Sequence, residues 1–414
     1  MTLDPAAIVL WHMLQSAALV SPDLQAWKSA GFHPVNDIAE RHAIHSYFNT
    51  CPESPDGRSV LYFTSAAIDG ESGDIRVFDR SGGKEKIVAS GIVTEDAHRV
   101  ACQQWFSNGR VVAWHNYDPQ TGRWSVCAAD LVSGGQKTLV EDRQLGFGSA
   151  TGDWAPVYGC HWNPGTHRDL ELVNVRTGEI RTPVTIGDVL RQYGSEIEQL
   201  LPGGGNVSIF FPVLSPDGQR VIFKLARGNG NGDSDSGGGG GGFRSRGASK
   251  REGMIVYDLT ARRFLGFFKE WGHPSWMPDS KKILQKKGIR QGGTVLIDLT
   301  DGSESLLVPG AAANHPAMSP VQALYVTDAN IAWKKGGRPG EWGIFVVSPA
   351  AKEFTIIHRF PFRDKGLGAQ SWRLPDPHPV FSADGKRIYF NVNDGPWTRL
   401  WVGVIESGGE RRSH

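Results

Sequence analysis

The feature that most constrains the fold is a short phrase that recurs along most of the chain: a turn rich in Ser, Pro, Asp and Gly, followed by a strand. Clear copies are Ser54–Gly57 before 59–64, Ser215–Gly218 before 221–224, and Ser382–Gly385 before 387–390, and looser ones begin at Ser107, Met277 and Met318. An Asp-Gly turn between two β-type segments is typical of a hairpin. Each copy therefore predicts a pair of antiparallel strands.

A second phrase, a short strand ending in Asp or Asn and a polar turn, follows many of these copies. It occupies 75–79, 170–174, 254–258 and 294–298. Two hairpins per repeat of about 40–60 residues are typical of a four-stranded propeller blade. Repeats lie near 54–90, 102–141, 150–185, 209–268, 273–308, 315–359 and 378–406. We predict an all-β, seven-bladed β-propeller with four antiparallel strands per blade; because the third repeat is degenerate, a six-bladed ring stays open as an alternative.

The repeats place the propeller at 45–408, and we expect the segment 1–44 to pack on the ring or to close it. A Gly-rich insertion at 228–250 interrupts the fourth blade, with unbroken glycine from 237 to 242. This segment has too little apolar surface to fold and should be a disordered surface loop. It lacks the Lys-Ser/Thr pair of a phosphate-binding P-loop.

Composition narrows the classes of partner. The formal net charge is +1, so no bulk field favours nucleic acid or an anionic membrane. The four cysteines are too few and too dispersed for a disulfide scaffold. His12 and Gln15 interrupt the N-terminal apolar run, which makes it a poor secretion signal. We expect a monomer, cytoplasmic by default, with periplasmic or secreted placement still open.

Histidines recur at one place in the repeats, just before the first strand of a blade: His45, His98, His273, His315 and His378. The innermost strands of a propeller surround its central axis, so residues at their starts come together from distant parts of the chain. A His-Pro pair could instead simply start a strand, and buried histidines are often only hydrogen-bonded.

Three phrases in the last blades carry a resemblance. They are Gly272-His273-Pro274-Ser275-Trp276, then Asn314-His315, then Gln370 followed by Asp376-Pro377-His378-Pro379. In this order they resemble oligogalacturonate lyase, a seven-bladed propeller that degrades short pectin fragments with a metal among such residues. Here Asp376 replaces the first His of the family's last pair. The resemblance implies a divalent metal ion (manganese, calcium or zinc) held by His273, His315, Gln370 and His378.

A second group lies in the second and third repeats: His98, His115, Tyr158 and Arg168. A His pair one hairpin apart, a Tyr and an Arg resemble the propeller lyases that act on ulvan and on rhamnose–glucuronate linkages. The resemblance implies that these four residues are catalytic, and we expect His45 to bind substrate. Arg176 and Arg191 lie nearby, and Arg168 could instead pair with Asp169 or Glu171. Tyr158 could instead pack between blades.

These residue types suit β-elimination of a uronoside, in which the C5 proton is removed and the C4 oxygen leaves. The sugar carboxylate must be neutralised as charge develops, by a cation or by an Arg. His and Tyr suit the proton transfers. We therefore expect a lyase for uronic-acid-containing oligosaccharides or polysaccharides, in which Tyr158 or His115 transfers protons, His98 and Arg168 hold the carboxylate, and the His273 group holds the metal.

The sequence also bears on two other classes of propeller protein. A non-catalytic propeller that binds a protein partner, like the translocation protein TolB, fits the repeats equally well. The propeller of a prolyl-oligopeptidase-type serine peptidase does not fit as an enzyme, because no G-x-S-x-G phrase is present and no residues remain for a hydrolase domain.

Overall fold

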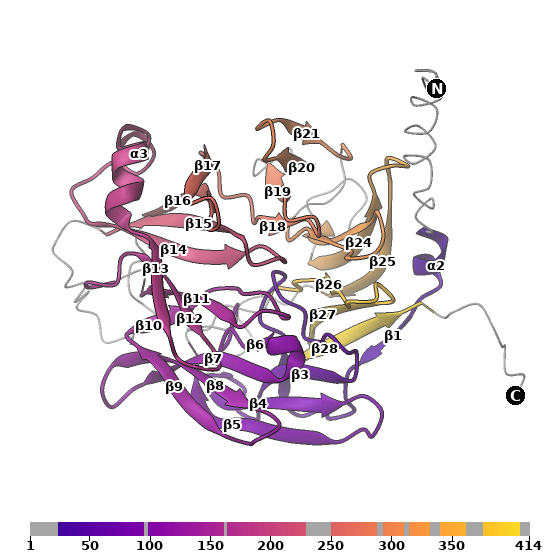
Figure 1. Cartoon of the computed structure of the whole chain (residues 1–414). Coiled ribbons are helices and arrows are strands. Elements are labelled where there is room, and N and C mark those ends of the chain that lie inside the picture. The colour runs from indigo at the N-terminus through magenta and orange to yellow at the C-terminus, as the bar shows by residue number, and fades with distance from the viewer. Residues whose placement is uncertain are drawn as a thin grey trace, which may run out of the picture.

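The computed structural model describes residues 24–94, 98–160, 164–228, 250–287, 293–309, 314–331, 340–361 and 376–405. Within these ranges the strands form seven four-stranded antiparallel sheets arranged around a common centre (Figure 1). The seven-bladed propeller is confirmed, and the six-bladed alternative is wrong. The degenerate third repeat forms a complete blade.

The strands of the first four blades are as follows. Blade 1 contains β2 (His42–Ile44), β3 (Ser59–Ser65), β4 (Ser72–Asp79) and β5 (Glu85–Val93); blade 2 contains β6 (Gln104–Phe106), β7 (Val111–Asp118), β8 (Arg123–Asp130) and β9 (Gln136–Glu141). Blade 3 contains β10 (Arg143–Leu145), β11 (Trp154–Gly159), β12 (Leu170–Asn174) and β13 (Ile180–Val184); blade 4 contains β14 (Val207–Leu214), β15 (Arg220–Arg227), β16 (Lys250–Asp258) and β17 (Arg263–Phe268).

The remaining blades follow the same order along the chain, with one exception at the closure. Blade 5 contains β18 (Ser275–Trp276), β19 (Lys282–Lys287), β20 (Gly293–Asp298) and β21 (Glu304–Leu306); blade 6 contains β22 (Ala317–Met318), β23 (Tyr325–Asn330), β24 (Glu341–Ser348) and β25 (Glu353–Pro361). Blade 7 contains β26 (Val380–Phe381), β27 (Arg387–Asp394) and β28 (Trp397–Val404), and its outer strand is β1 (Gly31–Pro34).

The ring is closed by strands from the two ends of the chain. β1 pairs antiparallel with β28, with Gly31 opposite Val404 and Pro34 opposite Trp401. The Thr398 amide also donates a hydrogen bond of 3.0 Å to Nδ1 of His42, in the first strand of blade 1. The first blade thus begins at His42, three residues before the boundary that the repeats suggested.

The Ser-Pro-Asp-Gly turns have one geometry, which explains why the phrase recurs. In Ser54–Gly57 the Ser54 hydroxyl donates to Asp56 at 2.6 Å and accepts the Ser59 amide at 3.0 Å. The turns at Ser215 and Ser382 repeat this pattern. Gly57 has φ +74°, a left-handed conformation that favours glycine. Each phrase is therefore a self-contained hairpin turn.

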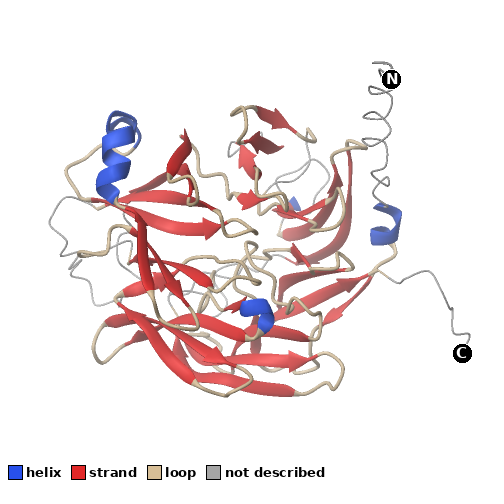
Figure 2. Cartoon of the chain, in the orientation of Figure 1, coloured by secondary structure: helices blue, strands red, loops and turns tan. Residues whose placement is uncertain are grey.

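The helices α2 (Leu24–Lys28) and α3 (Ile186–Leu200) lie at the outer edge of the ring, and the short 3₁₀ turn η1 (Ser107–Gly109) lies between β6 and β7 (Figure 2). Thr185 and Asp188 cap the start of α3 reciprocally, and the buried Val189 and Ile197 pack on the core of blade 4. None of the described helices is long and apolar enough to cross a membrane. Of the predicted insertion at 228–250, residues 229–249 lie outside the described residues.

Candidate functional site

The centre of the ring is filled by a segment of blade 1, residues 45–49, which we call the plug. The Ser46 hydroxyl donates to the Gln103 carbonyl of blade 2 at 3.0 Å, and the Asn49 side chain donates to the Pro274 carbonyl of blade 5 at 2.9 Å. Tyr47 and Phe48 are buried. The chain between β2 and β3 therefore crosses the central axis.

The plug provides an aromatic floor for a group of histidines from different blades. The Tyr47 ring lies 4.5 Å from the His378 ring and 5.4 Å from the His98 ring, centroid to centroid. The Phe48 ring lies 5.1 Å from the His315 ring. Residues 98, 315 and 378, far apart in sequence, thus meet above one surface.

The cluster at this point consists of His98, His315, Asp376 and His378, which we call the axial cluster. The His378 ring lies 4.7 Å from the His98 ring and 4.5 Å from the His315 ring. Asp376 Oδ2 lies 3.4 Å from Nδ1 of His98 and 3.9 Å from Nε2 of His315. The three imidazoles are buried, and the carboxylate, with 23% of its side chain exposed, is the most accessible member.

Left-handed backbone conformations occur where the chain approaches the inner strands. Val100, Phe211, His273 and His378 have φ between 44° and 55°. Such values are uncommon outside glycine, and for a β-branched residue such as Val100 they carry strain. Other residues with positive φ, such as Arg262 and Lys352, lie in turns between strands, whereas the backbone strain at these four falls near the plug.

Hydrogen bonds from the second strands of blades 6 and 7 hold the axial cluster. Nδ1 of His315 lies 3.0 and 3.1 Å from the two carboxyl oxygens of Asp328, on β23. The Asn391 side chain, on β27, donates to the carbonyls of His45 and Asp376 at 3.1 and 3.2 Å. Burial raises the pKa of Asp328 to about 8 in this structure, and the positive charge of a cation at the axial cluster would lower it again.

The axial cluster suits a first-row divalent ion. One ligand atom from each of His98, Asp376 and His378 lies within 4.8 Å of the other two. Donors bound to one ion at roughly 2.0–2.2 Å lie within about 4.4 Å of each other, so small side-chain rotations suffice. Imidazoles favour zinc over calcium, which prefers oxygen ligands, and the single carboxylate is also compatible with manganese. The residues present therefore fit the divalent ion that the sequence led us to expect.

The predicted metal set is only partly brought together by the structure. His315 and His378 belong to the axial cluster, and the His273 ring lies 4.7 Å from the His315 ring. Gln370 lies outside the described residues. His98, expected among the catalytic residues, lies in the axial cluster instead, together with Asp376.

His273 occupies the edge of this group. Its Nδ1–H donates to the Asn314 carbonyl at 2.9 Å, which leaves Nε2 with its lone pair. Burial, and then the neighbouring His315, hold the pKa of His273 well below its usual value. His273 is only half-buried, whereas His315 and His378 are fully buried. A neutral, partly accessible imidazole of this kind can accept a proton.

Cationic side chains flank the same region through an aromatic pair. The Arg99 guanidinium lies 5.2 Å from the Phe211 ring, and the Lys224 ammonium lies 5.4 Å from the Trp271 ring. Phe211 and Trp271 contact each other edge to face at 5.7 Å. Burial lowers the pKa of Lys224 to about 8. The two cations therefore place positive charge around this aromatic pair.

Tyr158 and Arg168, expected to be catalytic, are placed differently from each other. Tyr158 is fully buried on β11, where its hydroxyl accepts a hydrogen bond of 2.7 Å from Arg99. Arg168 is half-buried in the loop before β12, and its carbonyl accepts the Ile209 amide at 2.9 Å. Arg99, rather than Arg168, is the arginine that lies beside the axial cluster.

His115 and His45 are placed as links between blades. His115 is fully buried; its Nδ1 accepts the Leu145 amide of blade 3 at 3.2 Å, and its ring packs edge to face on Trp124 at 5.0 Å. His45 is 1% exposed, and its Nε2–H donates to the His378 carbonyl at 3.0 Å. Burial lowers the pKa of His115 to about 3 and that of His45 to about 4. Unlike His273, His115 and His45 offer almost no exposed surface to a substrate, which argues against proton transfer by His115 and against substrate contact by His45.

Sequence reasoning missed Arg99, Asp328 and the aromatic plug. Arg99 had a signal, because it directly follows His98 in the chain. Asp328 had a weaker one, a carboxylate inside an apolar strand where a buried charge requires a partner. No sequence signal marked Tyr47 and Phe48, because an aromatic pair near the end of a strand is equally typical of the hydrophobic core.

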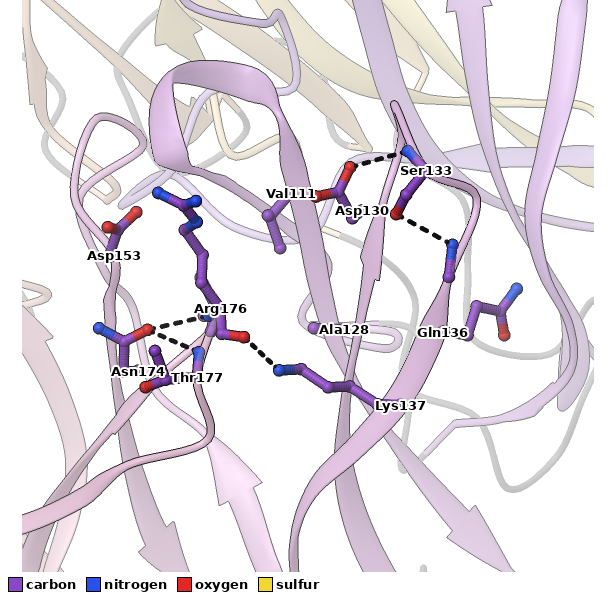
Figure 3. A pocket seen from close by; sticks show the side chains of 12 residues that line it. Val111, Ala128, Asp130, Ser133, Gln136, Lys137, Asp153, Asn174, Arg176 and Thr177 are labelled. Atoms are coloured by element: carbon purple, nitrogen blue, oxygen red, sulfur yellow. Dashed lines mark hydrogen bonds between the residues drawn. The ribbon is translucent and has the colours of Figure 1, made fainter.

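A separate groove of about 580 Å³ lies between blades 2 and 3 (Figure 3). It is lined by the turns that end β8 and β12, at the opposite ends of the strands from the residues that precede β6. Its polar groups bind one another: Lys137 donates to the Arg176 carbonyl, and Asn174 accepts the amides of Arg176 and Thr177. The groove is therefore distinct from the axial cluster.

Comparisons with known proteins agree with the fold. No protein-family model and no curated protein matches the chain. Among solved structures, an oligogalacturonate lyase in complex with manganese matches with a TM-score of 0.57 and 14% identity, over 91% of this chain and 96% of that one. An oligogalacturonate lyase from Vibrio parahaemolyticus matches with a TM-score of 0.60 and 10% identity, over 91% and 97%.

TolB from Acinetobacter baumannii also matches, with a TM-score of 0.41 and 14% identity over 84% of this chain and 67% of that one. At these identities the likenesses to the two oligogalacturonate lyases show a shared propeller fold and leave the reaction to be argued from the site. The likeness to ulvan and rhamnose–glucuronate lyases stays a prediction from the sequence. The chain is thus a seven-bladed β-propeller similar in structure to oligogalacturonate lyases.

Proposed function

We propose that this protein is a lyase that cleaves uronic-acid-containing oligosaccharides by β-elimination, with a divalent cation held by the axial cluster. The observation that carries the proposal is the meeting of His98, Asp376 and His378 at the ring centre within reach of one ion, with Nε2 of His315 3.9 Å from the Asp376 carboxylate. Three imidazoles and a carboxylate from three different blades are costly to bury together unless a ligand uses them.

The surrounding residues suit the rest of the chemistry. A bound cation would supply positive charge that neutralises the sugar carboxylate and makes the C5 proton more acidic. Arg99 and Lys224 add positive charge on the same side of the site. We assign the base to His273, whose neutral Nε2 takes the proton from C5; the C5–H electron pair then forms the C4–C5 double bond as the C4 oxygen leaves with the C4–O electron pair and takes a proton from water. This assignment replaces Tyr158 and His115 as the proton-transferring residues.

The test is incubation of the purified protein with a panel of uronic-acid polymers and oligomers, following the ultraviolet absorbance of the unsaturated uronide. We expect product with at least one acidic glycan, loss of product with a chelator, and recovery on adding manganese. His273→Gln should remove product formation while leaving manganese binding unchanged. Lys137→Ala, in the separate groove of Figure 3, is the matched control and should retain activity.

Two outcomes of this experiment would contradict the proposal. A folded protein that yields no unsaturated product from any member of the panel, with manganese present, would refute the lyase proposal and favour a binding function. Activity that survives a chelator and is unaffected by manganese would refute the assignment of the axial cluster to a catalytic cation.

A further inference from the structure

Asp328 is a carboxylate that the proposed chemistry does not use directly. It lies inside β23, is fully buried, and makes three hydrogen-bond contacts with one residue. Its Oδ1 accepts the His315 amide at 3.0 Å, and both of its oxygens lie within 3.1 Å of Nδ1 of His315. The same carboxylate therefore fixes the backbone and the ring of one member of the axial cluster.

This contact determines which nitrogen of His315 carries the proton and which carries the lone pair. When the Nδ1–H donates to Asp328, the lone pair belongs to Nε2. Nε2 is the atom that lies 3.9 Å from Asp376 Oδ2, in the axial cluster. Asp328 thus holds the Nδ1 edge of the His315 ring, and Nε2 on the opposite edge lies toward Asp376.

We propose that Asp328 is a positioning residue that sets the orientation and tautomer of His315 and so raises the affinity of the axial cluster for a divalent cation. The inference rests on the proposed cation site. A carboxylate behind a ligating imidazole also raises the basicity of the ring. Removal of such a partner typically lowers metal affinity by about 10- to 100-fold.

Calorimetric titration of metal-free protein with manganese chloride and zinc chloride tests the proposal without substrate. Asp328→Asn keeps the shape and one acceptor but removes the charge, so we expect about 10-fold weaker binding; Asp328→Leu removes every acceptor, so we expect a loss nearer 100-fold. The matched control is Asp258→Asn, a buried aspartate on β16 that binds the amides of Thr260 and Ala261. Its metal affinity should equal that of the wild type.

A second readout separates positioning from general stability. In the ¹⁵N spectrum of the histidine rings, His315 of the wild type should carry its proton on Nδ1, assigned by its disappearance in His315→Gln, and this pattern should be lost in Asp328→Leu. Asp328→Asn, the smaller change, keeps the test decisive where Asp328→Leu does not fold.

The outcomes distinguish the inference from the proposed function. Wild-type protein that binds neither ion contradicts the cation site itself, and the ring spectrum still decides whether Asp328 orients His315. Wild-type binding together with unchanged binding in Asp328→Asn and Asp328→Leu overturns the positioning role and leaves the site standing.

Discussion

His115 gives the sharpest prediction about stability, because its ring is buried, neutral and bonded across two blades. We consider the substitution His115→Asn, since the Asn carbonyl oxygen can take the place of Nδ1 and still accept the Leu145 amide. The substitution keeps that link and removes the titrating ring. His115→Ala would instead leave the buried amide unsatisfied and a cavity beside Trp124, at a cost of about 3–5 kcal/mol.

The pH dependence follows from the displacement of one pKa. In the folded protein burial lowers the pKa of His115 from 6.5 to about 3. Below pH 6.5 the His115 imidazole therefore binds a proton in the unfolded chain but stays neutral in the folded protein. The contribution of His115 to the free energy of unfolding is fully present above pH 6.5. It decreases as the pH falls, until the pH reaches the pKa of His115 in the folded protein. The loss between pH 7 and pH 5 is about 2 kcal/mol, and the whole displacement is worth about 5 kcal/mol.

Urea unfolding followed by tryptophan fluorescence, at pH 7 and pH 5 with a chelator present, measures this difference. We expect the wild type to lose about 2 kcal/mol more than His115→Asn between the two pH values. The displaced pKa of His45 is common to both proteins and cancels. His33→Asn, which removes an exposed ring, is the matched control and should follow the wild type.

The same reasoning is refuted if His115→Asn and the wild type lose equal stability on acidification. A further check concerns activity: His115→Asn should retain product formation at pH 7. An inactive but fully stable His115→Asn would restore His115 to the reaction.

Three other predictions follow from buried contacts. Arg387→Met should lower the free energy of unfolding by about 1.5–3 kcal/mol, because the Glu53 carboxylate, 1% exposed, loses bonds of 2.7 and 2.9 Å and keeps only the longer contact of 3.6 Å with Arg80 as an ion pair; urea unfolding measures this, and a loss under 1 kcal/mol would contradict it. Gly385→Ala should lower stability by about 1–3 kcal/mol, because φ is +68° and the new Cβ would lie 2.5 Å from Val321; an unchanged melting temperature would argue against that strain. His378→Ala should weaken manganese binding by on the order of 100-fold in calorimetric titration, and unchanged affinity would remove His378 from the site.

The fold was accessible from the sequence because its determinants are local. Each Ser-Pro-Asp-Gly turn is completed by hydrogen bonds among residues within five positions of one another, as at Ser54 and Asp56. A repeated local unit that cannot bury its own faces must stack beside its neighbours, so the repeat predicts the ring. The meeting of His98, His315 and His378 follows from the same geometry, since each precedes an inner strand.

The roles of individual side chains were decided by contacts between blades, which no local pattern encodes. His98 and His115 both looked catalytic, yet one lies beside Asp376 and the other accepts an amide of the next blade. The plug is held across the axis by hydrogen bonds to Gln103 and Pro274. These residues lie 57 and 225 positions from their partners in the plug, so no local pattern could reveal the contacts. The sequence by itself thus determined the blades and the place where histidines gather. Only the tertiary structure decided which imidazoles share a ligand site, because burial and partners depend on residues brought together by the closing of the ring.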